Sequence, residues 1–431
     1  MTKRTLSIIL GGLAGILLLG FLLYQIPAVK SSVDWRYFRI TTYLNGIIHP
    51  VSVAIPTALA VPTGQTSVVI PANLITPTPP AVTPQAQITA TPVAAPLPAQ
   101  VDLPAPGFED EKKFPNNCGP ATLTMALRFY GWTGDQFTIS KVLKPNPDDR
   151  NVNPDELVWW VRNNPGGLGL QAEARVNGNP TVLKQLLAAG FPVMIEETFI
   201  FDSSYWPNDD LWAAHYVLLT GYDDVKKEFT IQDAFHGPNL TVSYDKLEQD
   251  WEPFNHLYLV VYLPDQEQKL KDILGVDWDA NVNRQNALTA TQAATVSSPN
   301  DAFAWYNLGS NLVYFERYEE AVAAYDQARK IGLPQRMMRY SFGPFLADFY
   351  TNRIDDLMVI TQDTLDKAYS NGKKWSEEAW LWKGWGFYRQ GKITDAINAW
   401  KTAIDLHPNY CDAQNAIAFV QGTPAPAFCI P

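Results

Sequence analysis

The sequence predicts a multidomain protein made of an N-terminal transmembrane helix, a disordered linker, an α+β domain and an all-α repeat solenoid. Three observations predict this order. An almost unbroken apolar run covers Leu6 to Ile26, a Thr- and Pro-rich stretch follows, and the rest of the chain divides into a mixed segment and a repetitive helical one. With 431 residues, the chain is also too long for one ordinary core.

The N-terminal part predicts a membrane anchor. Residues 1–5 form a short basic leader, and residues 6–26 carry no charge and match the length that spans a bilayer as a helix. A signal peptide is the alternative, but no small-residue cleavage site follows closely. Positive charge at the N-terminus then predicts a single-pass cell-membrane protein with a cytoplasmic N-terminus and extracytoplasmic domains, joined through a juxtamembrane segment at 27–50.

Residues 51–106 are predicted to be a disordered Thr/Pro-rich linker. No Asp, Glu, Lys or Arg occurs between Ile40 and Val101. Such a sequence cannot bury a core and favours extended polyproline II, so we expect a stalk between the anchor and the folded part. A disordered tail without a spacing role is the alternative.

Residues 107–265 predict the α+β domain. Leu123, Leu127 and Tyr130 recur at helical spacing, and Gly131 ends that run. The later segments FPVMIEE, HYVLLTGYDD, KKEFTIQDAF and HLYLVVYLP are typical of strands. Because helices come first and strands later, an α+β arrangement is favoured over alternating βαβ units.

Residues 268–421 show the spacing of tetratricopeptide repeats, in which large and small residues interlock between antiparallel helices. The positions that carry the pattern are Trp305, Leu308, Gly309, Ala321, Tyr325 and Ala328, then Trp380, Gly384, Phe387, Ala396, Trp400, Ala403 and Pro408. A middle copy around Gly343 and Leu346 is degenerate, with extra residues near Tyr369 to Trp375. A capping helix is expected at Asp412 to Val420, and residues 422–431 form a tail.

Composition narrows the function. The net charge of −11 and the absence of a basic domain argue against a nucleic-acid partner. Three cysteines without a CxxC or a Cys/His cluster predict neither a disulfide scaffold, nor a metal site, nor a cofactor. Cys411 and Cys429 either pair across a short loop or remain as unpaired buried thiols; pairing would leave Cys118 as the single free thiol.

Cys118 is the candidate nucleophile. It stands at the start of the predicted helix, with Asn117 as a natural N-cap and Pro120 in the first turn. The positive end of a helix stabilises a thiolate, the reactive form of cysteine. A small buried apolar cysteine is the alternative interpretation.

The chain has five histidines, and histidine is the residue type best suited to accept the proton of this thiol. His215 opens the strand HYVLLTGY, and the next strand ends at Asp233. Pairing the two strands brings Asp233 near His215, where a carboxylate can orient the imidazole. His215 could instead be a strand-edge histidine satisfied by that carboxylate, and purely structural roles are favoured for His236 and His256.

The segments NNCGPATLTMALRFYG, LLAAGFPVMIEE, HYVLLTGYDD and FTIQDAF together resemble the bacteriocin-processing, or double-glycine-leader, type of papain-like cysteine peptidase. The resemblance covers roughly Gly107 to Pro264. It implies that Cys118 is the nucleophile, His215 the general base and acid, and Asp233 the orienting residue.

Members of this family usually carry a glutamine shortly before the cysteine, where it donates a hydrogen bond to the oxyanion. No glutamine lies between Val101 and Cys118. Asn116 and Asn117 are therefore candidate oxyanion donors, together with the backbone N–H of Cys118.

The sequence thus predicts a membrane-anchored, extracytoplasmic cysteine peptidase that acts on peptides or proteins and binds a protein partner through its repeats. The alternative is a membrane-tethered scaffold with an inactive peptidase-like domain, in which the repeats supply the function.

Overall fold

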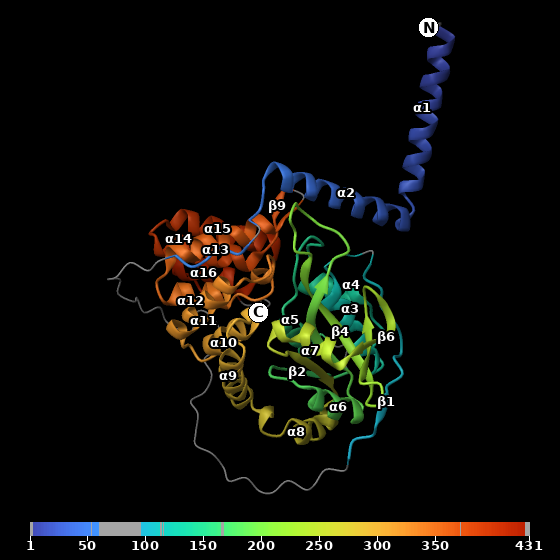
Figure 1. The fold of residues 1–431 in the computed structure, drawn as a ribbon. Coiled ribbons are helices and arrows are strands. Elements are labelled where there is room, and N and C mark those ends of the chain that lie inside the picture. The colour runs from blue at the N-terminus through green and yellow to red at the C-terminus, as the bar shows by residue number, and fades with distance from the viewer. Residues whose placement is uncertain are drawn as a thin grey trace.

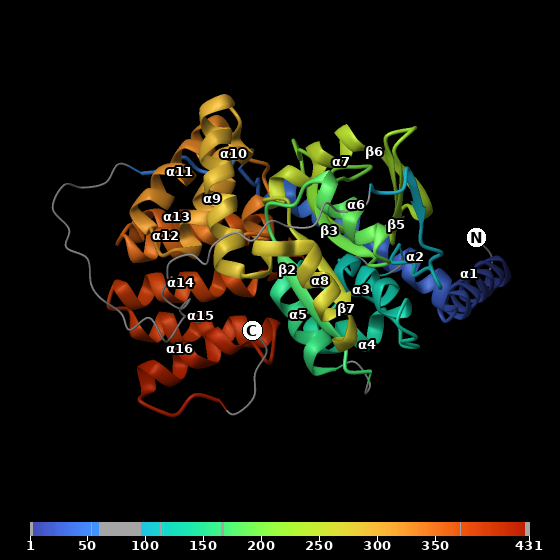
Figure 2. The ribbon, with the colours of Figure 1, turned by 90° about the horizontal axis from the view of Figure 1, so that it is seen from below.

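The computed structural model describes residues 3–52, 54–59, 96–112, 114, 116–164, 168–370 and 372–426. Its main body consists of a sheet-containing domain and a helical solenoid packed side by side (Figures 1 and 2). Two N-terminal helices, α1 (Lys3–Tyr24) and α2 (Pro27–Ile48), precede this body. The prediction of a multidomain chain with an α+β domain and an all-α repeat region is confirmed.

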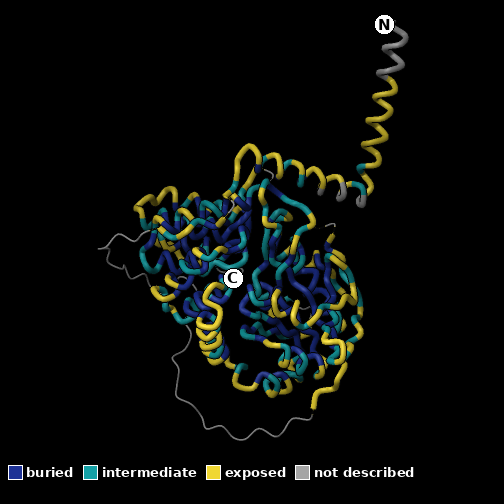
Figure 3. Tube along the Cα trace, in the orientation of Figure 1, coloured by how far each residue is buried: buried dark blue, intermediate teal, exposed yellow. Residues whose placement is uncertain are grey.

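Helix α1 projects away from the body, whereas α2 lies across it (Figure 1). The apolar side chains of α1 that the structure describes are exposed, Leu17 by 73% (Figure 3). None of the helices, over the residues described, is both long and apolar enough to cross a bilayer. The first five residues of the predicted transmembrane helix, residues 6–10, have side chains that the structure does not describe.

Both flanks of the predicted linker are structured, while residues 60–95 lie outside the described ranges. Ile55 is buried in the core of the solenoid, and the Pro56 carbonyl accepts a hydrogen bond of 2.7 Å from Arg329 Nε. At the other flank, strand β1 (Gln100–Asp102) pairs with the sheet, and Val101 packs against its core. The α+β domain therefore begins before the predicted residue 107.

The domain is built on one seven-stranded sheet with the order β2-β7-β3-β4-β5-β6, and β1 pairs with β4. All of these pairings are antiparallel. The remaining strands are β2 (Gln171–Arg175), β3 (Val193–Ile200), β4 (Trp212–Asp223), β5 (Glu228–Asp233), β6 (Gly237–Ser243) and β7 (Tyr258–Tyr262).

Helices cover both faces of this sheet. Alternate residues of its central strands point to opposite faces and therefore enter two separate cores. Met194 and Leu218 join one core with α3 (Cys118–Arg128), α4 (Gln136–Leu143) and α5 (Pro154–Asn163). Val193 and Val217 join the other core with α6 (Pro180–Ala188), α7 (Tyr244–Trp251) and α8 (Glu267–Leu274). The near-continuous apolar sequence of β3 and β4 follows from this burial on both faces.

The solenoid consists of α9 (Ala280–Ser297), the helix pairs α10 (Ala302–Tyr314) with α11 (Tyr318–Ile331), α12 (Gly343–Tyr350) with α13 (Ile354–Lys367) and α14 (Glu377–Arg389) with α15 (Ile393–Leu406), and a last helix, α16 (Cys411–Gln421). Gly309 lies against the ring of Tyr325, and Gly384 lies against the indole of Trp400. These contacts are the interlocking of small and large residues that the spacing predicts.

The extra residues after the middle copy form a small hairpin of β8 (Tyr369–Ser370) and β9 (Lys373–Lys374). Cys411 is disulfide-bonded and Cys118 is free, while Cys429 lies outside the described residues.

Gly384→Ala tests the interlocking. A Cβ at this position would overlap the rigid indole of Trp400, which is fully buried between α14 and α15. We expect a loss of about 1–3 kcal/mol in the free energy of unfolding, measured by urea denaturation. Lys401→Ala, at an exposed position of α15, is the control and should change stability by less than about 0.5 kcal/mol. Equal effects of the two substitutions would contradict this packing.

Candidate active site

Cys118 is the first residue of α3, and this end of the helix is fixed to the centre of the sheet. The Thr122 hydroxyl donates a hydrogen bond of 2.9 Å to the Tyr216 carbonyl on β4. Gly119 faces the ring of Tyr216, and a Cβ at this position would make ordinary van der Waals contact with that ring. The thiol is therefore held next to β4 and remains partly exposed at the N-terminal end of α3.

The imidazole of His215 lies between Cys118 and Asp233. His215 Nε2 is 2.8 Å from Asp233 Oδ1, which leaves Nδ1 on the side of the thiol. The packing of Phe199 against this ring, with centroids 5.0 Å apart, covers one side of it. Antiparallel pairing of β4 with β5 brings the histidine and the carboxylate together, as expected from the sequence.

Charge and hydrogen bonding favour the protonated imidazole. Burial on its own lowers the pKa of His215, but the hydrogen bond to Asp233 and the charge of a Cys118 thiolate raise it well above its usual value. Burial likewise raises the pKa of Asp233, and the bonds from His215 and His236 outweigh it and hold that pKa well below the usual range. The site thus favours an imidazolium at His215 that is oriented by the Asp233 carboxylate.

Glu111 is a site residue that the sequence analysis missed. It lies in the loop before α3, is only 5% exposed, and places Oε1 3.6 Å from His215 Nδ1. Its second oxygen, Oε2, is buried without a hydrogen-bond partner. Burial raises the pKa of Glu111 from its usual 4.5 to about 7, although the charge of His215 opposes this rise. The sequence signal for this residue is a carboxyl group in the short segment before the cysteine, at a place where family members carry glutamine.

Lys144, just after α4, is a second residue that the sequence analysis missed. Its buried ammonium donates a hydrogen bond of 3.1 Å to the Pro147 carbonyl. Desolvation lowers the pKa of Lys144, and the negative charges of Asp149, Cys118 and Glu111 counteract part of that effect. No sequence pattern marks this residue, because its proximity to Cys118 arises from the packing of α4 beside α3.

The two candidate oxyanion donors differ in their surroundings. Asn116 adopts a left-handed backbone conformation, with φ of 62°, and lines the cavity in front of Cys118. Asn117 is buried, makes no side-chain cap bond to α3, and donates from its amide to Gln136 Oε1. The side chain of Asn117 therefore points to α4, and the predicted capping contact does not form.

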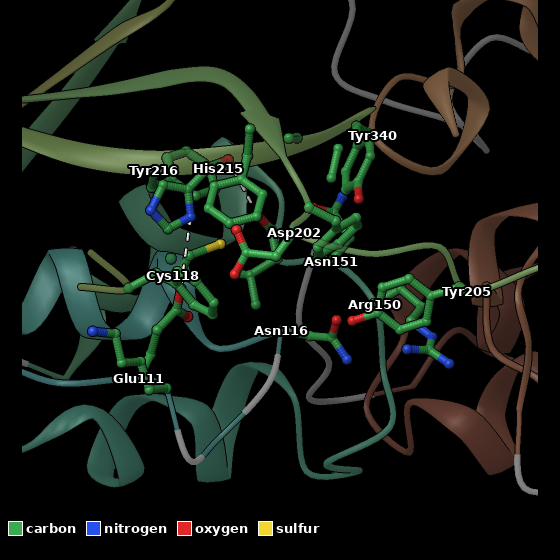
Figure 4. A pocket seen from close by; sticks show the side chains of 18 of the residues that line it. Glu111, Asn116, Cys118, Arg150, Asn151, Asp202, Tyr205, His215, Tyr216 and Tyr340 are labelled. Atoms are coloured by element: carbon green, nitrogen blue, oxygen red, sulfur yellow. Dashed lines mark hydrogen bonds and ion pairs between the residues drawn. The ribbon is translucent and has the colours of Figure 1, made fainter. Parts of the chain in front are cut away.

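Cys118, His215, Glu111 and Asn116 line a cavity of about 140 Å³. The candidate site residues Cys118, His215 and Glu111 lie at one end, and Arg150 with Tyr205 lies at the other (Figure 4). Segments far apart in the sequence complete the wall, including Arg39 of α2 and Tyr340 of the solenoid. Among the residues that the structure describes, no group of three or more His, Cys, Asp or Glu side chains is arranged to hold a metal ion.

Comparison with known proteins supports this arrangement at the level of the domain. Residues 82–259 match the Peptidase_C39 like family, and residues 386–423 match a TPR repeat. The chain is therefore similar to C39-like peptidases in its first matched segment and to a tetratricopeptide repeat in its second. The predicted resemblance to a papain-like cysteine peptidase is thereby confirmed for this domain. No curated protein matches the chain.

Several solved structures resemble parts of the chain. A protein described as a C39-like peptidase from Bacillus anthracis has 20% identity and a TM-score of 0.29, covering 38% of this chain and 97% of its own. MamA 41-end from Desulfovibrio magneticus RS-1 has 16% identity and a TM-score of 0.28, covering 32% of this chain and 75% of its own. A crystal structure of MamA has 14% identity and a TM-score of 0.28, with coverages of 37% and 81%.

Glu111→Gln tests the buried carboxyl beside His215. The pKa of Glu111 is about 7 in the folded protein and about 4.5 in the unfolded chain. Between these two pH values the unfolded chain releases the carboxyl proton and the folded protein keeps it, so the wild type loses stability as the pH rises. Glutamine removes that loss. Relative to wild type, the variant should therefore gain on the order of 3 kcal/mol across this interval, measured by urea unfolding at each pH.

The matched control for this prediction is Glu319→Gln, at an exposed position of α11. It should show no comparable pH-dependent gain. If the difference in unfolding free energy between Glu111→Gln and wild type stays constant from pH 4.5 to 8, the pKa of Glu111 is not raised in the folded protein.

Proposed function

We propose that this protein is a membrane-attached cysteine peptidase that hydrolyses peptide bonds through Cys118. The observation that carries the proposal is the position of His215, whose Nε2 is bound by Asp233 while Nδ1 faces the thiol at the start of α3. A nucleophile and a proton carrier thus line one cavity, and an orienting carboxylate is bound to the proton carrier.

In the proposed reaction, the Cys118 thiolate attacks the peptide carbonyl carbon, and the carbonyl π electrons move onto oxygen. Protonated His215 gives its Nδ1 proton to the leaving amine as the C–N bond breaks, which leaves a thioester on Cys118. Neutral His215 then takes a proton from water while the water oxygen attacks the thioester. Release of the carboxylic acid product restores the thiolate.

Backbone and side-chain donors near the thiol can stabilise the oxyanion. The N–H of Cys118 belongs to the first turn of α3, where backbone donors have no partner within the helix. The Asn116 amide lines the same cavity. Glu111 can donate a hydrogen bond there only in its protonated form, because an ionised carboxylate only accepts.

Labelling by an electrophilic peptide probe, such as a peptidyl acyloxymethyl ketone, tests the nucleophile. We expect rapid modification of Cys118, located by mass spectrometry, and a rate reduced on the order of a hundredfold or more in His215→Ala. Asp233→Asn should also slow the reaction, since the imidazole loses its orienting charge. His256→Gln is the control, because His256 bonds to Glu248 and does not line the cavity.

An unreactive Cys118 in a folded sample, or labelling unaffected by His215→Ala, would contradict the proposed peptidase function. The second candidate, a scaffold with an inactive peptidase-like domain, would then remain. The carboxyl of Glu111 favours that candidate, because at alkaline pH its negative charge, beside His215 and in the same cavity as the thiol, opposes formation of an oxyanion.

The repeats are proposed to bind a protein partner, as tetratricopeptide arrays commonly do. Several of their tryptophans are unsuited to line a groove. Trp382, Trp385 and Trp400 are buried between helices, so we expect a partner to contact other side chains.

Membrane attachment through α1 is proposed from the exposed apolar residues of that helix, with the folded domains outside the cytoplasm. The full chain should float with phosphatidylcholine and phosphatidylglycerol vesicles in a density gradient, whereas residues 27–431 should stay at the bottom. Flotation of both forms would place membrane binding elsewhere in the chain, and flotation of neither would overturn the proposal.

A further inference from the structure

A second, small cavity, of about 20 Å³, adjoins the one that contains Cys118. The two cavities share five lining residues: Asn116, Arg150, Phe201, Tyr205 and Tyr340. The second cavity lies between the C39-like domain, α2 and the solenoid, and its wall includes Arg336, Arg339 and Lys367. A ligand that reaches Cys118 can therefore extend directly into a basic cavity.

Two guanidinium groups in this cavity, those of Arg150 and Arg339, form no ion pair with the residues that the structure describes. Arg339 is 7% exposed, and its Nε and Nη2 are buried without a hydrogen-bond partner. Arg150 Nε is likewise buried and unpartnered. Among the ion pairs of the described residues, none includes Arg150 or Arg339, although the charge of Asp148 acts on Arg150. Burying a cation without an anion costs free energy, so a negatively charged ligand beside Arg150 and Arg339 would stabilise both side chains.

The neighbouring cations are already neutralised. Arg336 binds Asp209 through both terminal nitrogens, each at 2.6 Å. Lys367 Nζ is 2.6 Å from Asp363 Oδ2. The excess positive charge therefore belongs to Arg150 and Arg339. Burial, followed by the positive charges of Arg336 and Arg150, lowers the pKa of Arg339 to about 9, and the charges of Tyr340 and Asp209 offset part of this change.

Aromatic side chains hold part of this cluster in place. The guanidinium of Arg336 lies 4.1 Å from the ring centroid of Trp206, and that of Arg339 lies 5.5 Å from the same ring. The Trp206 indole in turn donates a hydrogen bond of 2.8 Å to Gln335 Oε1. Planar guanidinium groups that are fixed in this way bind carboxylates with little loss of side-chain entropy.

We infer that Arg150 and Arg339 form a subsite for a carboxylate of the peptide that the active site receives. This inference rests on the proposed function, because the subsite adjoins the cavity of Cys118. The carboxylate belongs either to an Asp or Glu side chain of the peptide or to its free C-terminus. The ligand class is thus an acidic peptide, or a peptide bound near its C-terminal end.

Affinity selection on the full chain with Cys118→Ala tests the subsite without requiring turnover. The probes are random octapeptide pools in four forms: with or without Asp and Glu, and with a free or an amidated C-terminus. We expect at least tenfold enrichment of peptides that carry a carboxylate, read by mass spectrometry. Enrichment that follows Asp and Glu identifies a side-chain carboxylate, and enrichment that follows the free end identifies the C-terminus.

Two variants in the Cys118→Ala background locate the effect, Arg339→Gln and Arg150→Gln. Each should reduce the enrichment severalfold or more, and melting curves verify that each is folded. If Arg339→Gln does not fold, Arg150→Gln carries the test. Arg317→Gln, which removes an arginine paired with Glu320 on the outer surface of the solenoid, is the control and should leave the enrichment unchanged.

Equal recovery of the four pools, recovery of no peptide, or enrichment that survives both arginine substitutions would overturn the subsite. These outcomes are distinct from failure of the proposed function. Labelling of Cys118 without a carboxylate preference would support the peptidase function and contradict the subsite. A carboxylate preference that depends on Arg150 and Arg339, without labelling, would support the subsite on a binding protein.

Discussion

The attachment of the first turn of α3 to β4 is the constraint on which the site depends. The bond from the Thr122 hydroxyl to the Tyr216 carbonyl holds Cys118 beside the strand that carries His215. The next strand pair then supplies Asp233. Because the sheet is covered on both faces, these relative positions are those of a packed core and not of a mobile loop.

The cavity in front of this site is a product of the whole chain. Arg336, from the solenoid, forms a buried two-point ion pair with Asp209 in the loop between β3 and β4. This contact, together with α2, closes the far end of the cavity, where Arg150 and Tyr340 lie. The solenoid therefore has a structural role at the active-site cavity in addition to any partner that it binds.

The elements that the sequence predicted best depend on local pattern. The period of apolar residues locates α3, and the pairing of small with large residues locates α10 with α11 and α14 with α15, because helix periodicity and interlocking are short-range properties. The linker prediction was less complete. Composition shows that 51–106 cannot form its own core, but it does not show that Ile55 is buried in another core or that β1 adds to an existing sheet edge.

By itself, the sequence determined a thiol at a helix start, a histidine and a carboxylate on consecutive strands, and a repeat array after them. The tertiary structure alone decided that Asn117 turns to Gln136, that Glu111 stands beside His215, and that Arg150 and Arg339 share one cavity. The physical reason is that these last relations join side chains from separate elements. Their burial and charge interactions exist only once the sheet, the solenoid and α2 have packed together.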